Sequence, residues 1–220
     1  MSDFPFNVVA FDLDGTLADT ASDLSAALNH TLERFGRPAI DPDSVRHLVG
    51  HGARSLIRKG LAATGDAPEE LVEQGLSIYL EYYGNHICVG TTLYPALEDA
   101  MDVLAGFGVS LAICTNKGEL LSRRLVDALG WNGRFASIIG ADTLMVRKPD
   151  PRPLHEAIAR AGGGRGAFVG DSITDADTAR AAGVPFVAVS FGFSDRPVGE
   201  LGADAVIDSY ADLVTVLERL

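Results

Sequence analysis

An apolar run that ends in two carboxylates occupies residues 6–16, which read Phe6-Asn7-Val8-Val9-Ala10-Phe11-Asp12-Leu13-Asp14-Gly15-Thr16. The apolar part predicts a buried strand, and the Asp-Gly pair predicts a turn directly after it. In open α/β sheets, ligands bind at the carboxyl edge, where these two acids would stand. Two carboxylates there can supply a nucleophile and a proton carrier, held together by a hard cation. This stretch alone leaves a plain turn open as the alternative.

Polar residues also follow three later strand-like runs, at 109–114, 137–140 and 167–170. The polar segments are Thr115-Asn116, Arg147-Lys148-Pro149 and Asp171-Ser172-Ile173-Thr174-Asp175. Alternation of short β-branched runs with helical patterns predicts parallel strands joined by crossover helices, and therefore an α/β fold. Because the carboxyl ends of parallel strands share one edge of the sheet, we expect the polar segments to meet there.

In their order along the chain, these four motifs resemble those of the haloacid dehalogenase-like superfamily. A further likeness to its phosphoglycolate phosphatase-type subfamily rests on three short segments, Thr115-Asn116-Lys117, Gly50-His51-Gly52-Ala53 and Phe191-Gly192-Phe193. The resemblance covers essentially the whole chain. It implies a Rossmann-like three-layer core with a parallel sheet, plus an inserted α-helical cap domain.

The pattern of apolar residues predicts where such an insertion lies. Residues 1–17 and 91–220 form the predicted core, and residues 18–90 form the predicted helical cap, inserted after the first strand with hinges near Ala18 and Gly90. The insertion shows two apolar stripes at helical spacing. The stripes are Ala21, Leu24, Leu28, Leu32 and Phe35, then Leu71, Gly75, Ile78, Tyr79 and Tyr82. A rigid helical decoration is the alternative to a cap that opens and closes.

The resemblance also implies catalytic roles. Asp12 matches the nucleophile that forms an aspartyl phosphate, and Asp14 matches the residue that protonates the leaving oxygen and later activates water. Carboxylates beside a phosphate need a counter-charge, which makes Mg²⁺ the expected cofactor. Its implied ligands are the Asp12 carboxylate, the Asp14 backbone carbonyl and Asp171, with Asp175 supporting them. Caps of a helix N-terminus are the alternative roles of Asp171 and Asp175.

Phosphate binding is expected from residues at two other strand ends. Thr115 and Asn116 offer a hydroxyl, an amide and backbone N–H groups, and Lys148 offers a compact positive charge. In the predicted cap, Gly52 and Arg54 belong to a glycine-flanked loop that enters a helix and could hold a second anionic group. This arrangement suits 2-phosphoglycolate, although a surface connection between two helices is the alternative reading of the loop.

The predicted activity is therefore Mg²⁺-dependent hydrolysis of a small phosphorylated metabolite, with 2-phosphoglycolate as the first expectation. Sugar or amino-sugar phosphatases fit nearly as well, and a β-phosphoglucomutase-like phosphomutase shares the core and the cap type. A dehalogenase would not need Asp14 as a proton donor. A receiver-like phospho-aspartate signalling domain also pairs acids, a threonine, a lysine and Mg²⁺, but it has no place for the helical insertion.

Composition bounds the class of protein and its partners. The chain has 220 residues, 47% of them hydrophobic, and a formal net charge of -12. Such an acidic balance argues against nucleic-acid and anionic-membrane partners, because binding to polyanions depends on basic patches. No apolar run approaches the ~20 residues of a membrane span, and we expect a cytoplasmic enzyme, monomeric or homodimeric. Cys88 and Cys114 lack metal-ligand spacing and are not site candidates.

Overall fold

A six-stranded parallel sheet forms the centre of the computed structural model, which describes residues 4–194 and 196–220. Its strand order is β5-β4-β1-β6-β7-β8, and each neighbouring pair is parallel. The strands are β1 (Val8–Phe11), β4 (Ser110–Cys114), β5 (Ser137–Ile139), β6 (Gly166–Gly170), β7 (Phe186–Val189) and β8 (Ala205–Ile207). The predicted α/β class is confirmed, because the strand-like runs form the parallel sheet.

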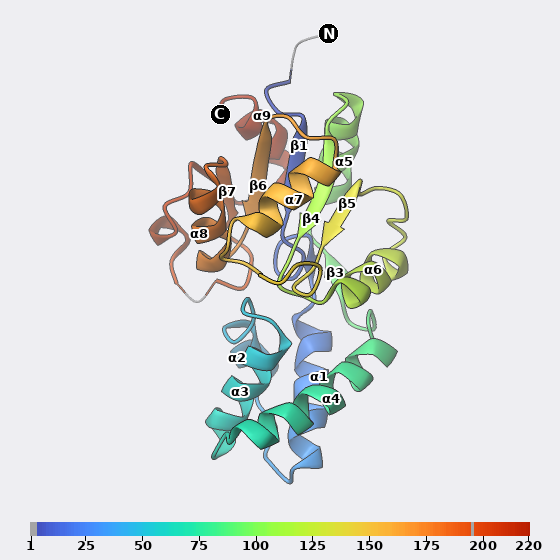
Figure 1. The fold of residues 1–220 in the computed structure, drawn as a ribbon, viewed down its shortest axis with the longest axis vertical. Coiled ribbons are helices and arrows are strands. Elements are labelled where there is room, and N and C mark those ends of the chain that lie inside the picture. The colour runs from blue at the N-terminus through green and yellow to red at the C-terminus, as the bar shows by residue number, and fades with distance from the viewer. Residues whose placement is uncertain (1–3, 195) are drawn as a thin grey trace.

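Both faces of the sheet are buried, which makes the core three-layered. The β1 strand is buried at all of its positions, as expected of a central parallel strand. Val9 and Phe11 face a cluster that includes α5 (Leu97–Gly106), α6 (Glu119–Ala128) and α9 (Leu213–Leu217). Val8 and Ala10 face the other cluster, with α7 (Arg152–Arg160) and α8 (Ile173–Ala182). Short 3-10 turns, η1 (Val198–Glu200) and η2 (Tyr210–Asp212), complete the core. Figure 1 shows α7 and α5 on opposite sides of the sheet.

A group of helices inserted between β1 and β4 packs on its own. These inserted helices are α1 (Ala21–Arg34), α2 (Pro42–Arg46), α3 (Ala53–Thr64) and α4 (Glu69–Asn85). Leu28, Ile57 and Tyr79, from three of these helices, are buried together in a hydrophobic cluster separate from the two beside the sheet. Figure 1 shows the inserted helices below the carboxyl ends of the strands. Their position leaves the sheet edge, with its polar residues, between the two parts of the molecule.

Two short strands connect the core to the inserted helices. β2 (Ala18–Asp19) leaves the core and β3 (Thr92–Leu93) returns to it, paired antiparallel. Next to them, the buried Asp23 carboxylate accepts hydrogen bonds from the backbone N–H groups of Val89, Gly90 and Thr91, at 2.8 to 3.1 Å. One side chain on α1 therefore fixes the returning segment beside the outgoing one. Whether the helices move about this junction stays a prediction.

The buried face of α4 shares Gly75 and Tyr79 with the predicted apolar stripe but differs from it at both ends. Val72, Gly75, Tyr79 and Tyr83 are the buried positions, and Tyr82 is only partly buried. These positions are three or four residues apart, which is the spacing of one helix face. The difference places Tyr83 inside the molecule, on the face of α4 that is directed at the core. Within the described residues, no helix combines the length and apolar character needed to cross a membrane.

Candidate active site

Three carboxylates and one lysine meet at the carboxyl edge of the sheet. Asp12 follows β1, Asp171 follows β6, and Asp175 lies in the first turn of α8. Lys148 lies between β5 and α7, with its Nζ 3.0 Å from Asp12 Oδ1 and 2.6 Å from Asp175 Oδ1. All of these side chains are buried. Three motifs that are far apart in the sequence thus form one cluster, as the parallel topology predicts.

Burial governs the charge of Asp12. One oxygen of its carboxylate accepts a hydrogen bond of 2.7 Å from the backbone N–H of Leu13. Removal from water raises the pKa of the Asp12 carboxyl from its ordinary 3.8 to about 6, although Lys148 opposes the rise. Burial opposes the charge of Lys148 as well, but Asp12 and Asp175 hold its pKa above the ordinary value. At neutral pH, the lysine is therefore a cation and Asp12 is ionised and available as a nucleophile.

Hydrogen bonds fix the orientation of the Asp171 carboxylate. Its Oδ1 accepts from Thr16 Oγ1 at 2.8 Å, and its Oδ2 accepts from the backbone N–H of Phe193 at 2.6 Å. Gly15 approaches this side chain with a φ of +83°, and a Cβ there would lie 2.6 Å from Asp171 Oδ2. The glycine of the first motif is therefore required by close packing as well as by the turn.

Asp175 has a structural role in addition to its contact with Lys148. Its Oδ2 accepts from Ser172 Oγ at 2.6 Å and from the Ser172 backbone N–H at 3.1 Å. The Ser172 side chain in turn accepts from the Asp175 backbone N–H, which completes a capping box at the start of α8. The helix cap considered from the sequence is therefore present at Asp175, together with a place in the charged cluster.

The carboxylate cluster fits a hard divalent cation. Asp12, Asp171 and Asp175 each offer an oxygen, and these oxygens lie within 4.8 Å of one another. Burial, together with the charges of Asp175 and Asp12, raises the pKa of the Asp171 carboxyl well above its ordinary value. One lysine cannot neutralise three buried carboxylates, so the cluster has an excess of negative charge. Oxygen donors of this kind are the ligands that Mg²⁺ prefers.

Asp14 is held by a residue to which the sequence reasoning assigned no role. Lys117 Nζ lies 2.7 Å from Asp14 Oδ1 and 2.9 Å from Asp14 Oδ2, and Thr20 Oγ1 donates to Oδ1 at 2.7 Å. The Lys117 side chain is 5% exposed, and its ammonium lies 4.6 Å from the centre of the Tyr83 ring. Lys117 directly follows the Thr115-Asn116 motif, so its place after a strand end was the available signal.

Thr115 and Asn116 join the core to the loop before α3. Asn116 Nδ2 donates at 3.2 Å to the backbone carbonyls of Gly50 and Lys148, while its buried Oδ1 has no hydrogen-bond partner in the described part of the chain. Gly52 packs against the same residue, because a Cβ there would lie 3.1 Å from the Asn116 carbonyl oxygen. The Thr115 hydroxyl accepts from the Lys117 backbone N–H at 3.2 Å. The predicted phosphate-binding residues and Gly52 are therefore brought together.

Arg54 lies elsewhere. Its Nη1 forms an ion pair of 2.9 Å with Glu69, and it also contacts Glu73, with all three side chains substantially exposed. Both glutamates belong to α4. The contact therefore links α3 to α4 on the surface of the inserted helices, and Arg54 is not among the residues that line the cavity described next.

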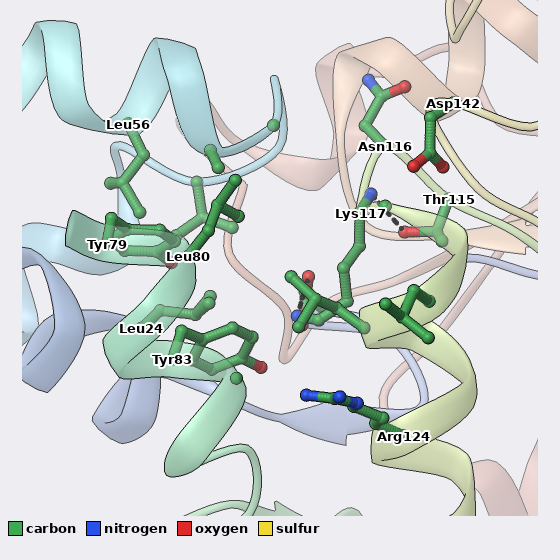
Figure 2. Close-up of a pocket in the computed structure, with 18 of the residues that line it drawn as sticks. Leu24, Leu56, Tyr79, Leu80, Tyr83, Thr115, Asn116, Lys117, Arg124 and Asp142 are labelled. Atoms are coloured by element: carbon green, nitrogen blue, oxygen red, sulfur yellow. Dashed lines mark hydrogen bonds and ion pairs between the residues drawn. The ribbon is translucent and has the colours of Figure 1, made fainter. Parts of the chain in front are cut away.

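A cavity of about 340 Å³ separates the inserted helices from the core. Figure 2 shows Leu24, Leu56, Tyr79, Leu80 and Tyr83 on one side of it and Thr115, Lys117 and Arg124 on the other. Asp12 and Asp14 also line it, which connects the cavity to the carboxylate cluster. The inserted helices offer mostly apolar side chains, whereas the core offers polar and charged ones together with Leu120 and Leu121. A substrate at Asp12 would extend into this space.

Comparisons with known proteins agree with this geometry. A phosphoglycolate phosphatase of Mesorhizobium japonicum is 46% identical over 220 residues, covering 97% of this chain and 96% of that protein. One from Agrobacterium fabrum is 40% identical, covering 99% of this chain and 95% of that protein. A crystal structure described as a predicted phosphoglycolate phosphatase from Haemophilus somnus 129pt superposes with a TM-score of 0.90 at 27% identity, covering 96% and 97% of the two chains. The model of the haloacid dehalogenase-like hydrolase family matches residues 9–189. The chain therefore belongs to the haloacid dehalogenase-like hydrolases.

Proposed function

We propose that this chain is a Mg²⁺-dependent phosphomonoester hydrolase that works through a phosphorylated Asp12. The buried cluster of Asp12, Lys148, Asp171 and Asp175 is the observation that carries the proposal. Phosphoryl transfer needs an in-line nucleophile, positive charge beside the phosphate oxygens, and a proton for the leaving alkoxide. The cluster and its neighbour Asp14 contain all of these groups within one water-poor site.

Each protein group has a defined task in the two half-reactions. A carboxylate oxygen of Asp12 attacks phosphorus, the bond from phosphorus to the ester oxygen breaks, and Asp14 donates a proton to that oxygen. Water then attacks the phosphorus of phosphorylated Asp12 while Asp14 takes a proton from it, which releases inorganic phosphate and restores the carboxylate. Lys148 Nζ, 3.0 Å from Asp12 Oδ1, balances negative charge beside the nucleophile.

The metal-binding part of the proposal follows from the donor set. Asp12, Asp171 and Asp175 would hold Mg²⁺ together with the backbone carbonyl of Asp14, and the ion would supply positive charge to the phosphate oxygens. The Thr16 hydroxyl and the Phe193 backbone N–H donate hydrogen bonds to the Asp171 carboxylate and so fix its orientation in the cluster. Such hydrogen bonds to ligand side chains fix the ligand geometry.

We further propose 2-phosphoglycolate as the substrate. The names of the relatives that are 40% and 46% identical support this choice, as does the size of the cavity. The inserted helices would act as a cap that shields the reaction from water, and the contact of Gly50 with Asn116 joins them to the phosphate-binding motif. A two-carbon ester is small enough to be enclosed between the two parts.

A sugar or amino-sugar phosphate is the second candidate, but the cavity wall favours it less. Apart from Tyr79 and Tyr83, the inserted helices and their loops line the cavity with aliphatic side chains, backbone and glycines. Several sugar hydroxyls would lose hydrogen bonds to water there without gaining partners. CbbY of Rhodobacter sphaeroides, a structure obtained in complex with phosphate, shares the fold with a TM-score of 0.81 at 22% identity. At that identity, the likeness extends to the fold alone.

Phosphate release tests the proposal directly. Wild type is assayed on 2-phosphoglycolate and on a panel of sugar phosphates at equal concentration, with Mg²⁺ and with a chelator. We expect activity that depends on Mg²⁺ and prefers 2-phosphoglycolate, and we expect Asp12→Asn to abolish it while circular dichroism shows an intact fold. Turnover by Asp12→Asn would refute the nucleophile, whereas a preference for sugar phosphates would refute only the substrate.

A further inference from the structure

We infer that Tyr83 of α4 and Arg124 of α6 together bind the carboxylate of the substrate, and so determine specificity for 2-phosphoglycolate. The inference rests on the proposed function, because it names the residues that recognise the part of this substrate remote from phosphorus. Both residues line the cavity that extends from Asp12 between the inserted helices and the core. One of them belongs to each part of the molecule.

The Tyr83 hydroxyl is a polar group with no partner in the described part of the chain. The residue is 1% exposed, and its hydroxyl is buried with no hydrogen-bond partner among the described residues. Buried hydroxyls are nearly always hydrogen-bonded, since an unpaired one costs free energy. Figure 2 shows the Tyr83 oxygen directed away from α4, toward the side of the cavity where Lys117 and Arg124 lie. A carboxylate in the cavity would accept the missing hydrogen bond.

Arg124 supplies the positive charge. Its guanidinium has no ion pair or hydrogen bond within residues 4–194 and 196–220, whereas the neighbouring Arg123 pairs with Glu119. Arg124 reaches the inserted helices, because its Nη1 lies 3.3 Å from where a Cβ on Gly84 would stand. Gly84 directly follows Tyr83, and Figure 2 shows Arg124 extending from α6 toward this part of α4. A guanidinium fork matches a carboxylate geometrically.

The two lysines at the site already have carboxylate partners. Lys117 lines the cavity but pairs with Asp14, and Lys148 pairs with Asp12 and Asp175. Arg54, the candidate from the sequence, pairs with glutamates of α4. Among the described residues that line the cavity, Arg124 is therefore the cation left for a ligand.

A carboxylate bound by this pair would join the two parts of the molecule. Tyr83 belongs to the inserted helices and Arg124 to the core, so the ligand would favour the arrangement in which both reach it. Carboxylate recognition would then be linked to enclosure of the reacting phosphate. A substrate without the carboxylate would lack this contribution to binding.

The test compares two substrates that differ in the carboxylate. Wild type, Arg124→Ala and Tyr83→Phe are assayed on 2-phosphoglycolate and on ethyl phosphate, which keeps a two-carbon alkyl ester but has no carboxylate. Arg123→Ala is the matched control, since it removes the same charge from the adjacent position of α6, where the side chain pairs with Glu119. Tyr83→Phe keeps the buried ring, and thermal unfolding of each variant verifies its fold.

We expect kcat/KM on 2-phosphoglycolate to fall about 10- to 100-fold in Arg124→Ala, mainly through KM, because one charge-assisted interaction is lost. Tyr83→Phe should lose about 10- to 100-fold on the same substrate, as expected for one hydrogen bond to a charged group. Values for ethyl phosphate should stay at the wild-type level in both variants, Arg123→Ala should match wild type on both substrates, and Arg124→Lys should recover part of the loss.

The outcomes separate the inference from the function on which it rests. A wild type that prefers 2-phosphoglycolate, with a preference that survives in Arg124→Ala and Tyr83→Phe, overturns the inference and leaves the function standing. Equal losses on both substrates also overturn it, because the residues would then act on the fold or the chemistry. A wild type with no preference for 2-phosphoglycolate over ethyl phosphate overturns the proposed substrate and the inference with it.

Discussion

Burial of Asp12 should make the stability of the metal-free protein depend on pH in a direction opposite to that of an ordinary salt-bridged acid. The pKa of Asp12 is about 6 in the fold and 3.8 for an ordinary aspartate. The folded protein therefore binds more protons than the unfolded chain between these values. Stability falls as pH rises through this window, and the destabilisation is fully present above the folded pKa.

The difference between a pKa of about 6 and 3.8 corresponds to about 3 kcal/mol, at about 1.36 kcal/mol per pH unit. Near pH 7.5 this entire cost applies. Integration over the titration shows that about 1.4 kcal/mol of it is regained by about pH 5. In Asp12→Asn the titrating group is absent, so the free energy of unfolding of wild type should gain about 1.4 kcal/mol on the variant over this range. Asp171, whose pKa burial also raises, is present in both proteins, so its own titration contributes to the pH dependence of each and largely cancels in their difference.

Urea denaturation in the presence of a chelator measures this difference, with the fluorescence of buried Trp131 as the signal. The control is Asp142→Asn, because Asp142 also lines the cavity but is exposed to water. This variant makes the same change of an acid to an amide at another residue that lines the cavity. A constant difference between wild type and Asp12→Asn would refute the argument that burial raises the Asp12 pKa. With Mg²⁺ present, wild type should be stabilised near pH 7.5, since an ion bound only by the folded state favours folding.

Two further substitutions test contacts described above. Lys117→Met removes the ammonium group 2.7 Å from Asp14, so kcat on alkyl phosphates should fall about tenfold or more. The loss on p-nitrophenyl phosphate should be smaller, because its leaving group needs no proton. Equal losses on both substrates in steady-state assays would contradict a positioning role for Lys117. Asp23→Ala removes the acceptor of three backbone N–H groups at the junction, so urea denaturation should show a free energy of unfolding lower by about 2–4 kcal/mol. A decrease below about 1 kcal/mol would indicate that water replaces the carboxylate.

The core of the site was predictable because it depends on topology. Asp12, Lys148 and Asp171 each follow a strand, and parallel strands present their carboxyl ends on one edge. The strand-like runs in the sequence therefore determined which distant residues would meet. Mostly apolar strands, buried on both faces, are recognisable without any knowledge of their partners.

The inserted helices were less predictable, since periodicity shows that a helix has an apolar face but does not fix the face exactly. The expected stripe on α4 included Tyr82, whereas the structure buries Tyr83. A shift of one residue turns a helix face by about 100°, the angle for 3.6 residues per turn. This angle separates the partly buried Tyr82 from Tyr83, which lines the cavity beside Asp12 and Asp14 and whose hydroxyl has no hydrogen-bond partner among the described residues.

Arg54 and Arg124 illustrate why a charged residue cannot be assigned to a ligand from its own neighbourhood in sequence. Arg54 follows a glycine-flanked loop that does reach the site through Gly52, yet its guanidinium binds Glu69, which comes from another helix. Arg124 directly follows Arg123 in the sequence, and the sequence pattern does not distinguish the two arginines. The distinction arises from what each guanidinium meets in three dimensions. An arginine with a carboxylate partner on the protein gains less by binding a second one, whereas an unpaired arginine beside a cavity keeps its full capacity for an anionic ligand. Specificity in this family member would then depend on which cations the fold has left without a partner.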